Sequence, residues 1–129
     1  DGIPTLIVEA GGIGPAFDME TVENAAERLQ NVLRALGMLD GEVTEYGPFN
    51  FFSTFDWCCA TKAGLYERTV GCGETVKKGQ TIGRYYDVYG NPAGEATGRN
   101  SGGVLATHPG AIMARGETLI HIGLNPKEA

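Results

Sequence analysis

The chain has 129 residues, of which 42% are hydrophobic, so it is long enough to form a compact domain with a core. It contains 10 Lys and Arg residues against 16 Asp and Glu residues, which gives a formal net charge of −6. No basic cluster could neutralise a run of phosphates, which disfavours nucleic-acid binding driven by electrostatics. The longest apolar run near the start, Leu6-Ile7-Val8, is far shorter than the ~20 residues that span a bilayer, so no membrane segment is expected.

The start of the chain and its cysteines indicate a cytoplasmic protein. Residues 1–4 lack the charged region and the long apolar core of a signal peptide. The chain has 3 cysteines, two of them adjacent (Cys58 and Cys59), which is not a disulfide framework. Neighbouring strand residues point to opposite faces, so these two thiols are not expected to bind one metal ion together. Reduced, partly buried thiols are expected.

Residues 1–40 predict a strand, a glycine loop and a helix. Thr5–Val8 is apolar and β-branched, as in a strand buried on both faces, and the glycine loop follows it. The helix is expected to begin after Asp18, a good N-cap, and to end at Gly37. Its apolar positions form one face: Val22, Ala25, Ala26, Leu29, Val32, Leu33 and Leu36. Because one strand and one helix cannot bury both faces of the strand, this part is interpreted as the last strand–helix unit of a larger α/β sheet.

Residues 41–129 predict a separate β-rich domain, so the fold class is α+β, mainly β. Glycines separate short runs of residues that favour strands, at Phe49–Phe55, Thr81–Tyr89 and Thr118–Ile122. The segment also repeats itself: residues 76–82 and 113–119 share the pattern apolar-x-x-Gly-(Gln/Glu)-Thr-apolar, with Gly79 and Gly116 37 residues apart. Two such half-units are expected to stack into a small barrel.

This repeat resembles the biotinyl/lipoyl carrier domains, whose fold is a barrel-sandwich hybrid of two interlocked halves. Carrier domains present a lysine on the hairpin between the halves. The corresponding segment here, residues 83–90, has no lysine. The resemblance therefore extends to the fold, and a swinging-arm function is not expected.

Two further motifs are assigned structural roles. The glycine loop resembles part of a dinucleotide fingerprint, but Phe17 stands where a third glycine is required, and Pro15 removes a backbone N–H. A turn is the favoured interpretation. His108 and His121 have no carboxylate or second histidine at metal-ligand spacing, so neither is assigned to a metal.

Glu9 is the candidate catalytic residue. It ends an apolar strand where the glycine loop begins, and active sites of α/β sheets gather at such positions. On position alone, two alternatives stay open: Glu9 acts in catalysis, or it caps the strand or pairs with an arginine. A catalytic glutamate there, beside a zinc-bound water, would accept the proton of the water and pass it to a leaving amine.

Several segments resemble the succinylglutamate desuccinylase/aspartoacylase family. Residues 2–12, Gly-Ile-Pro-Thr-Leu-Ile-Val-Glu-Ala-Gly-Gly, resemble its "G-x-P-x-x-x-x-E-x-G" segment. Residues 33–39, Leu-Arg-Ala-Leu-Gly-Met-Leu, are similar to the "L-R-x-L-G-M-L" that follows it. Further matches occur in the same order at residues 63–66, 76–83, 107–109 and 116–119.

The resemblance implies a longer zinc-dependent hydrolase, of which this chain is the C-terminal part. Family members have an N-terminal zinc-carboxypeptidase-like α/β domain followed by a small β-domain. Their zinc ligands, a His-x-x-Glu pair and a later His, lie in the N-terminal domain, so none is assigned here. Of the family's catalytic residues only the general acid/base maps onto this chain, at Glu9. The implied reaction is hydrolysis of the amide bond of an N-acyl amino acid by a zinc-activated water, and the chain alone is expected to be inactive.

An alternative function is a non-catalytic module. The β-domain would then cover an active-site mouth of the N-terminal catalytic domain or bridge subunits, and assembly into homo-oligomers stays open. Its aromatic residues would form that surface, although alternating aromatics also form cores. These residues are Phe49, Phe51, Phe52, Phe55, Trp57, Tyr85, Tyr86 and Tyr89.

Overall fold

The computed structural model describes residues 2–3, 5–12 and 18–128. The chain divides into two compact units, Asp1–Gly47 and Pro48–Ala129. The sequence predicts a boundary between the two parts after residue 40, whereas contacts within the structure place it after Gly47. Each unit is described by itself, and the assignment of the first to a larger α/β domain stays a prediction.

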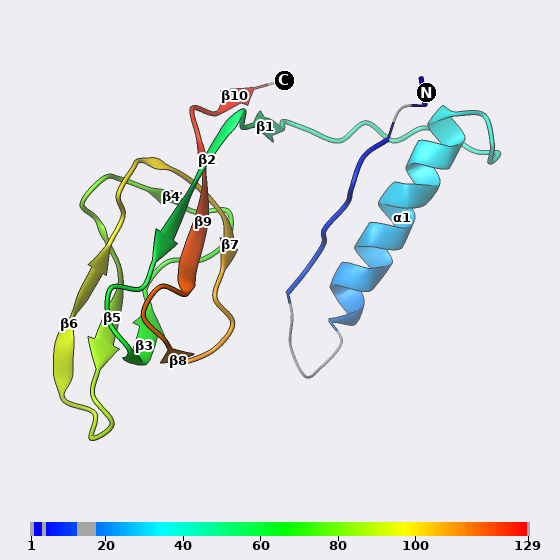
Figure 1. Ribbon diagram of the computed structural model, residues 1–129. Coiled ribbons are helices and arrows are strands. Elements are labelled where there is room, and N and C mark those ends of the chain that lie inside the picture. Colours follow the sequence, from blue (N-terminus) through cyan, green and yellow to red (C-terminus); the bar gives the residue numbers. More distant parts are fainter. Residues whose placement is uncertain (1, 4, 13–17, 129) are drawn as a thin grey trace. The chain divides into compact units, whose positions relative to one another are not determined.

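The first unit is built around helix α1, Met19–Ala35, whose two ends lie where the sequence predicts them (Figure 1). The Asp18 carboxylate accepts a hydrogen bond from the Thr21 backbone N–H at 3.4 Å, and its bonds to Thr21 hold the pKa of Asp18 below its usual value. At the other end Gly37 has a φ of 68° and donates to the Arg34 carbonyl at 2.9 Å. Both predicted caps are confirmed.

The predicted strand Thr5–Val8 has no strand pairing within the described residues; its expected neighbours belong to a sheet outside this chain, so it stays a prediction. The segment runs beside α1 as irregular backbone (Figure 1). A β-strand requires hydrogen-bonded neighbours, and no described segment pairs with residues 5–8.

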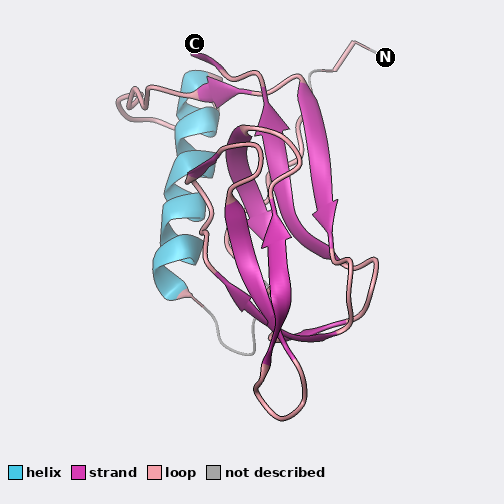
Figure 2. Cartoon of the chain, turned by 90° about the vertical axis from the view of Figure 1, so that its left-hand side faces the viewer, coloured by secondary structure: helices cyan, strands magenta, loops and turns pink. Residues whose placement is uncertain are grey.

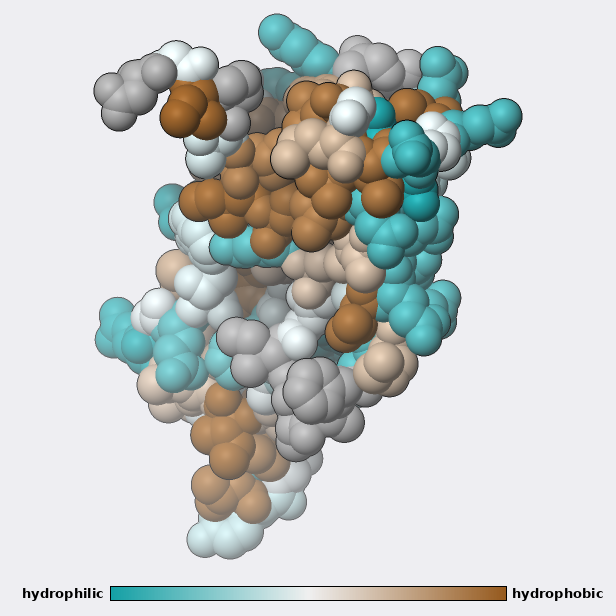
Figure 3. All heavy atoms as spheres, turned by 90° about the vertical axis from the view of Figure 1, so that its right-hand side faces the viewer, coloured by the Kyte–Doolittle hydropathy of each residue, from teal (hydrophilic) through white to brown (hydrophobic). Residues whose placement is uncertain are grey.

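Within the described residues the apolar face of α1 is largely exposed, and no residue of the helix is buried. In the space-filling view of Figure 3 a broad hydrophobic area lies over this unit. Its exposed apolar side chains are Ile3, Leu6, Ile7, Val8, Met19, Val22, Leu29, Val32, Leu36, Met38, Leu39 and Val43.

The segment after the helix returns along α1, which explains why the unit extends past residue 40. Asn31 and Thr44 form a reciprocal pair: the Asn31 amide donates to the Thr44 carbonyl, and the Thr44 N–H donates to Asn31 Oδ1, both at 2.8 Å. The Tyr46 hydroxyl donates to Glu27 at 3.2 Å, and the Arg28 guanidinium lies 4.2 Å from the Tyr46 ring centre. Neither the Asn31–Thr44 pair nor the contacts of Tyr46 were expected from the sequence.

The second unit is a β-domain of two four-stranded antiparallel sheets, which Figure 2 shows as two layers of strands. The strand orders are β2-β9-β7-β4 and β6-β5-β3-β8, and β1 pairs with β10 separately. The strands are β1 (Asn50–Phe51), β2 (Thr54–Cys59), β3 (Gly64–Arg68), β4 (Thr75–Val76), β5 (Thr81–Tyr86), β6 (Pro92–Thr97), β7 (Gly102–Thr107), β8 (Ile112–Met113), β9 (Thr118–Leu124) and β10 (Lys127–Glu128).

The sequence repeat is a structural repeat whose halves exchange strands. Within each half β3 pairs with β5, and β7 pairs with β9. Between halves β3 pairs with β8 of the second half, and β7 pairs with β4 of the first. Both repeat glycines adopt positive φ, 83° at Gly79 and 93° at Gly116, as the predicted turns require.

The two repeat turns are also held by equivalent hydrogen bonds. In the first turn the Lys77 backbone N–H donates to the Gln80 side chain at 3.0 Å. In the second the Ala114 backbone N–H donates to the Glu117 side chain at 2.7 Å. The Gln/Glu position of the repeat pattern therefore closes its turn by binding the backbone three residues before it.

The core of the β-domain lies between its two sheets. Its buried side chains are Cys58, Ala60, Tyr66, Val70, Val76, Ile82, Tyr85, Ala96, Val104, Met113, Leu119, Ile120 and Ile122. The Tyr66 hydroxyl donates to the Ile82 carbonyl at 2.9 Å, which satisfies it inside the core. Burial raises the pKa of Tyr66 to about 12.

The shifted pKa of Tyr66 predicts a loss of stability in alkali. An unfolded tyrosine ionises near pH 10, whereas Tyr66 in the folded domain ionises near 12. Its contribution is therefore complete below pH 10 and is lost between pH 10 and 12, because only the unfolded state releases the proton there. Urea unfolding at pH 9 and pH 11 measures this decline. Tyr66→Phe is expected to make it smaller, whereas Tyr89→Phe, at an exposed position, serves as the control; an equal decline in Tyr66→Phe would contradict the assignment.

Candidate functional site

Glu9 lies in the irregular segment that precedes the glycine loop, and its side chain is exposed. The ion pairs of the described residues are Arg84–Glu67 and Arg84–Glu95, so the described part of the chain provides no arginine partner for Glu9.

In the segment before the glycine loop, the side chains that face α1 are apolar, and Glu9 is not one of them. Leu6, Val8 and Ala10 line one wall of a groove of about 730 Å³ whose other wall is α1, from Thr21 to Val32. These are alternate residues of the segment. Glu9 is not among the residues that line the groove.

Gly11 sets the turn that follows Glu9. Its φ is 82°, a conformation that residues with a side chain rarely adopt. A Cβ atom added to Gly11 would lie 2.8 Å from the Thr21 methyl carbon, so a larger residue would push this turn away from the helix. This contact gives a steric reason for the glycine of the "E-x-G" pattern. The remainder of the loop, residues 13–17 with Pro15 and Phe17, lies outside the described residues.

The two histidines lie in the β-domain and take structural positions. His108 Nδ1 bonds with the Gly110 backbone N–H at 3.0 Å, in the predicted turn. His121 stacks on Trp57, with ring centres 3.8 Å apart and planes 3° apart. Among the described residues its buried Nε2 has no hydrogen-bond partner.

The described residues do not fit a zinc ion. Within residues 2–3, 5–12 and 18–128, no three His, Cys, Asp or Glu side chains lie together as a metal site requires. Cys58 is buried and Cys59 is exposed, as expected for neighbours in a strand, and burial raises the pKa of the Cys58 thiol. A raised pKa disfavours the thiolate that binds metal.

The β5–β6 hairpin is closed by Asp87. The Asp87 carboxylate accepts hydrogen bonds from the Tyr89 and Asn91 backbone N–H groups, each at 2.9 Å. Its bonds to Asn91 hold the pKa of Asp87 below its usual value. The hairpin tip carries Val88 and Tyr89 and is a tight turn held by Asp87.

The sequence does not show which aromatic residues of the β-domain lie in the core and which lie on the surface. Tyr85 is buried in the core, whereas Phe49, Phe51, Phe55, Trp57 and Tyr89 are exposed. Sequence analysis missed the pairing of Trp57 with His121. The alternation Phe55-x-Trp57, with two aromatic residues on one face of a strand, is the signal that could have indicated an unusual outer face.

No helix in the described part of the chain is long and apolar enough to cross a membrane. No protein family model and no curated protein matches the sequence. Solved structures do match. The apo ectoine utilization protein EutE (DoeB) from Ruegeria pomeroyi is 25% identical with a TM-score of 0.72, and the match covers 85% of this chain and 36% of that one.

Two further solved structures are described as members of one family. The succinylglutamate desuccinylase/aspartoacylase from Rhodobacter sphaeroides is 22% identical with a TM-score of 0.72, over 88% of this chain and 37% of that one. A succinylglutamate desuccinylase/aspartoacylase family protein from Shewanella amazonensis SB2B is 17% identical with a TM-score of 0.73, over 88% and 33%. The chain thus has the fold of about a third of these proteins.

Proposed function

We propose that this chain is the C-terminal part of a zinc-dependent deacylase of the succinylglutamate desuccinylase/aspartoacylase type, which hydrolyses the amide bond of N-acyl amino acids. The supporting observation is a fold match over 88% of this chain to proteins of that family, together with the Gly-x-Pro…Glu-x-Gly pattern around Glu9. The uncovered apolar side of the first unit fits the same proposal, because a larger α/β sheet would cover it.

In this proposal Glu9 is the general acid/base. It accepts a proton from the attacking water while the water oxygen bonds to the amide carbon, and it returns that proton to the nitrogen as the carbon–nitrogen bond breaks. Zinc, which lowers the pKa of a bound water and polarises the carbonyl, belongs to the part of the protein outside this chain. The chain alone is then inactive.

The β-domain is proposed to be a barrel-sandwich hybrid. The strand exchange between its halves and the equivalent turns at Gly79 and Gly116 support this assignment. Because its hairpin carries no lysine, the domain serves the enzyme as a structural module and not as a carrier.

An assay of the full-length protein encoded by the gene tests the function. With N-acyl amino acids as substrates, it should release the free amino acid, lose this activity after treatment with a chelator and regain it with Zn²⁺. The 129-residue chain should show none. Activity that survives complete removal of the metal, or the absence of hydrolysis across a panel of acyl groups, would reject the proposal.

The glycine after Glu9 gives a second prediction. Gly11→Ala should lower kcat of the full-length protein, because the added methyl meets the Thr21 methyl and a left-handed φ costs about 1 kcal/mol for alanine. The double variant Gly11→Ala/Thr21→Ser, which removes that methyl, should recover part of the loss. Gly12→Ala is the control, since its Cβ would meet nothing within 4 Å. An equal loss of kcat in Gly11→Ala and Gly12→Ala would show that the contact between position 11 and Thr21 does not affect activity.

A further inference from the structure

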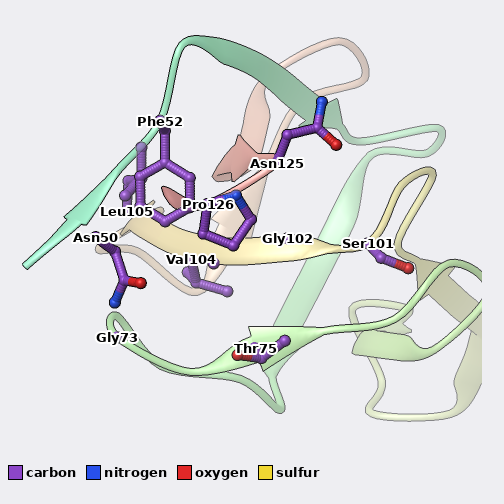
Figure 4. Close-up of a pocket in the computed structure, with 11 residues that line it drawn as sticks. Asn50, Phe52, Gly73, Thr75, Ser101, Gly102, Val104, Leu105, Asn125 and Pro126 are labelled. Carbon is purple, nitrogen blue, oxygen red and sulfur yellow. The ribbon is translucent and has the colours of Figure 1, made fainter. Parts of the chain in front are cut away.

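A groove of about 420 Å³ lies on the β-domain, beside strands β4 and β7. In Figure 4 the rings of Phe52 and Pro126 lie on one side of it and Thr75 of β4 on the other, with β7 between them. Its volume is within the range of roughly 300–1,000 Å³ that is usual for ligand pockets. The residues that line it all belong to the second unit: Asn50, Phe52, Gly73, Thr75, Ser101, Gly102, Gly103, Val104, Leu105, Asn125 and Pro126.

Two irregularities of the backbone occur at residues that line this groove. Asn125 has a φ of 52°, and it is the one residue other than glycine with a positive φ in the described part of the chain. A residue before a proline normally adopts extended backbone, so Pro126 makes this conformation still less favourable. Leu105 is the extra residue of a β-bulge, because the pairing of β7 with β9 shifts between Val104 and Ala106. Strained residues and bulges are typical of places where a fold positions side chains for a ligand.

Two carboxamides of the groove have unused hydrogen-bonding capacity. Asn50 and Asn125 lie apart from each other along the groove (Figure 4). The carboxamides of Asn31, Asn91 and Asn100 each bond to another group of the chain. Those of Asn50 and Asn125 have no hydrogen-bond partner among the described residues. Each therefore offers a ligand both a donor and an acceptor.

A carboxamide is matched by a peptide group, and the chain itself contains an example. The Asn31 carboxamide donates to the Thr44 carbonyl and accepts from the Thr44 backbone N–H, both at 2.8 Å. Between the two carboxamides of the groove, the Phe52 and Pro126 rings supply apolar surface for a side chain. No residue of the lining is charged, so a charged ligand would lose its hydration there without gaining an opposite charge.

We infer that this groove binds a short, uncharged segment of another polypeptide in an extended conformation. The carboxamides of Asn50 and Asn125 pair with peptide groups of the segment, and one of its apolar side chains packs against Phe52. The segment is extended because its peptide groups are then free to pair. The N-acyl amino acids of the proposed function carry a carboxylate and do not match this uncharged lining, so the inference does not rest on that function.

A nuclear magnetic resonance titration of the 129-residue chain with the blocked tripeptide N-acetyl-Gly-Leu-Gly-amide tests the inference. The backbone signals of Gly102 and Gly103, which line the groove, should shift to saturation with a Kd of about 1 mM or below. The same tripeptide with a free carboxylate at its end should bind at least about tenfold more weakly, because the lining offers no positive charge.

Asn125→Gly is the decisive variant, because glycine adopts the positive φ of this position and the substitution removes the carboxamide. It should bind the blocked tripeptide about three- to tenfold more weakly, as expected for the loss of a hydrogen bond. Its unfolding temperature should stay within about 2 °C of the wild type. Asn91→Ala is the control, since Asn91 lies in the β5–β6 hairpin and does not line the groove, and it should bind like the wild type.

Several results would overturn the inference. They are the absence of saturable shifts at the groove up to about 20 mM tripeptide, equal affinity for the two tripeptides, and an unchanged affinity in Asn125→Gly. Shifts of the same signals by N-acetylglucosamine, with none by the tripeptide, would assign the groove to a saccharide instead. Shifts of these signals that grow with protein concentration in the absence of peptide would assign it to a second copy. Hydrolysis by the full-length protein is measured separately, so a failure of the proposed function would leave this inference standing.

Discussion

Gly102→Ala is expected to destabilise the β-domain by about 3 kcal/mol, the upper part of the usual range for overpacking. A Cβ atom at this position would lie 2.2 Å from the Gly123 carbonyl oxygen and 2.5 Å from Ile122 Cγ2. Since the nearest obstacle is backbone, no rotamer change relieves the contact. β7 would have to move away from β9, and this movement would also strain its pairing with β4, where Gly102 stands opposite Val76.

Urea unfolding of the β-domain measures the effect. Gly71→Ala is the control, because its new methyl would meet only the end of the flexible Glu74 side chain, at 3.2 Å. The control should stay within about 1 kcal/mol of the wild type. A midpoint for Gly102→Ala that equals the control would show that β7 and β9 can separate at this point without loss.

The β-domain was predictable because its signals are local. The repeat pattern located two equivalent turns, and both glycines have the expected positive φ. The caps of α1 at Asp18 and Gly37 were predictable for the same reason, since a helix end depends on a few neighbouring residues. The β-prone run Phe49–Phe55 holds parts of two strands and not one: β1 covers Asn50–Phe51, and β2 begins at Thr54. Phenylalanine favours strands wherever it occurs, and pairing with β9 decides which residues form one.

The candidate site was less predictable because it depends on distant partners. Residues 5–8 have the composition of a strand, yet they pair with nothing in the described chain, and strand formation is a property of the sheet. The neighbours of Trp57 on the outer face of β2 could be predicted only from the register of β2 with β9. That register places Trp57 opposite His121, and no local sequence pattern contains it. Glu9 was identified from a motif; its side chain is exposed in the structure, and its catalytic role stays a prediction.

Glu9→Gln in the full-length protein is expected to lower kcat at least about 100-fold, since a general acid/base contributes roughly 10²–10⁴ to the rate. Glutamine keeps the size of the side chain and cannot hold the proton that moves from the attacking water to the leaving nitrogen. KM should change little, because the role of Glu9 is in the transition state and not in binding. Steady-state kinetics with an N-acyl amino acid measure both constants.

The control for this variant is Glu20→Gln, an exposed carboxylate in the first turn of α1. It removes one negative charge from the same unit and should keep nearly full activity. Both variants should unfold at the wild-type temperature within about 2 °C, because Glu9 has no ion pair in the described chain whose loss would weaken the fold. Undiminished turnover in Glu9→Gln would remove Glu9 from the mechanism. A loss that appears in KM alone would make it a binding residue, and the proton would then have to move through a group outside this chain.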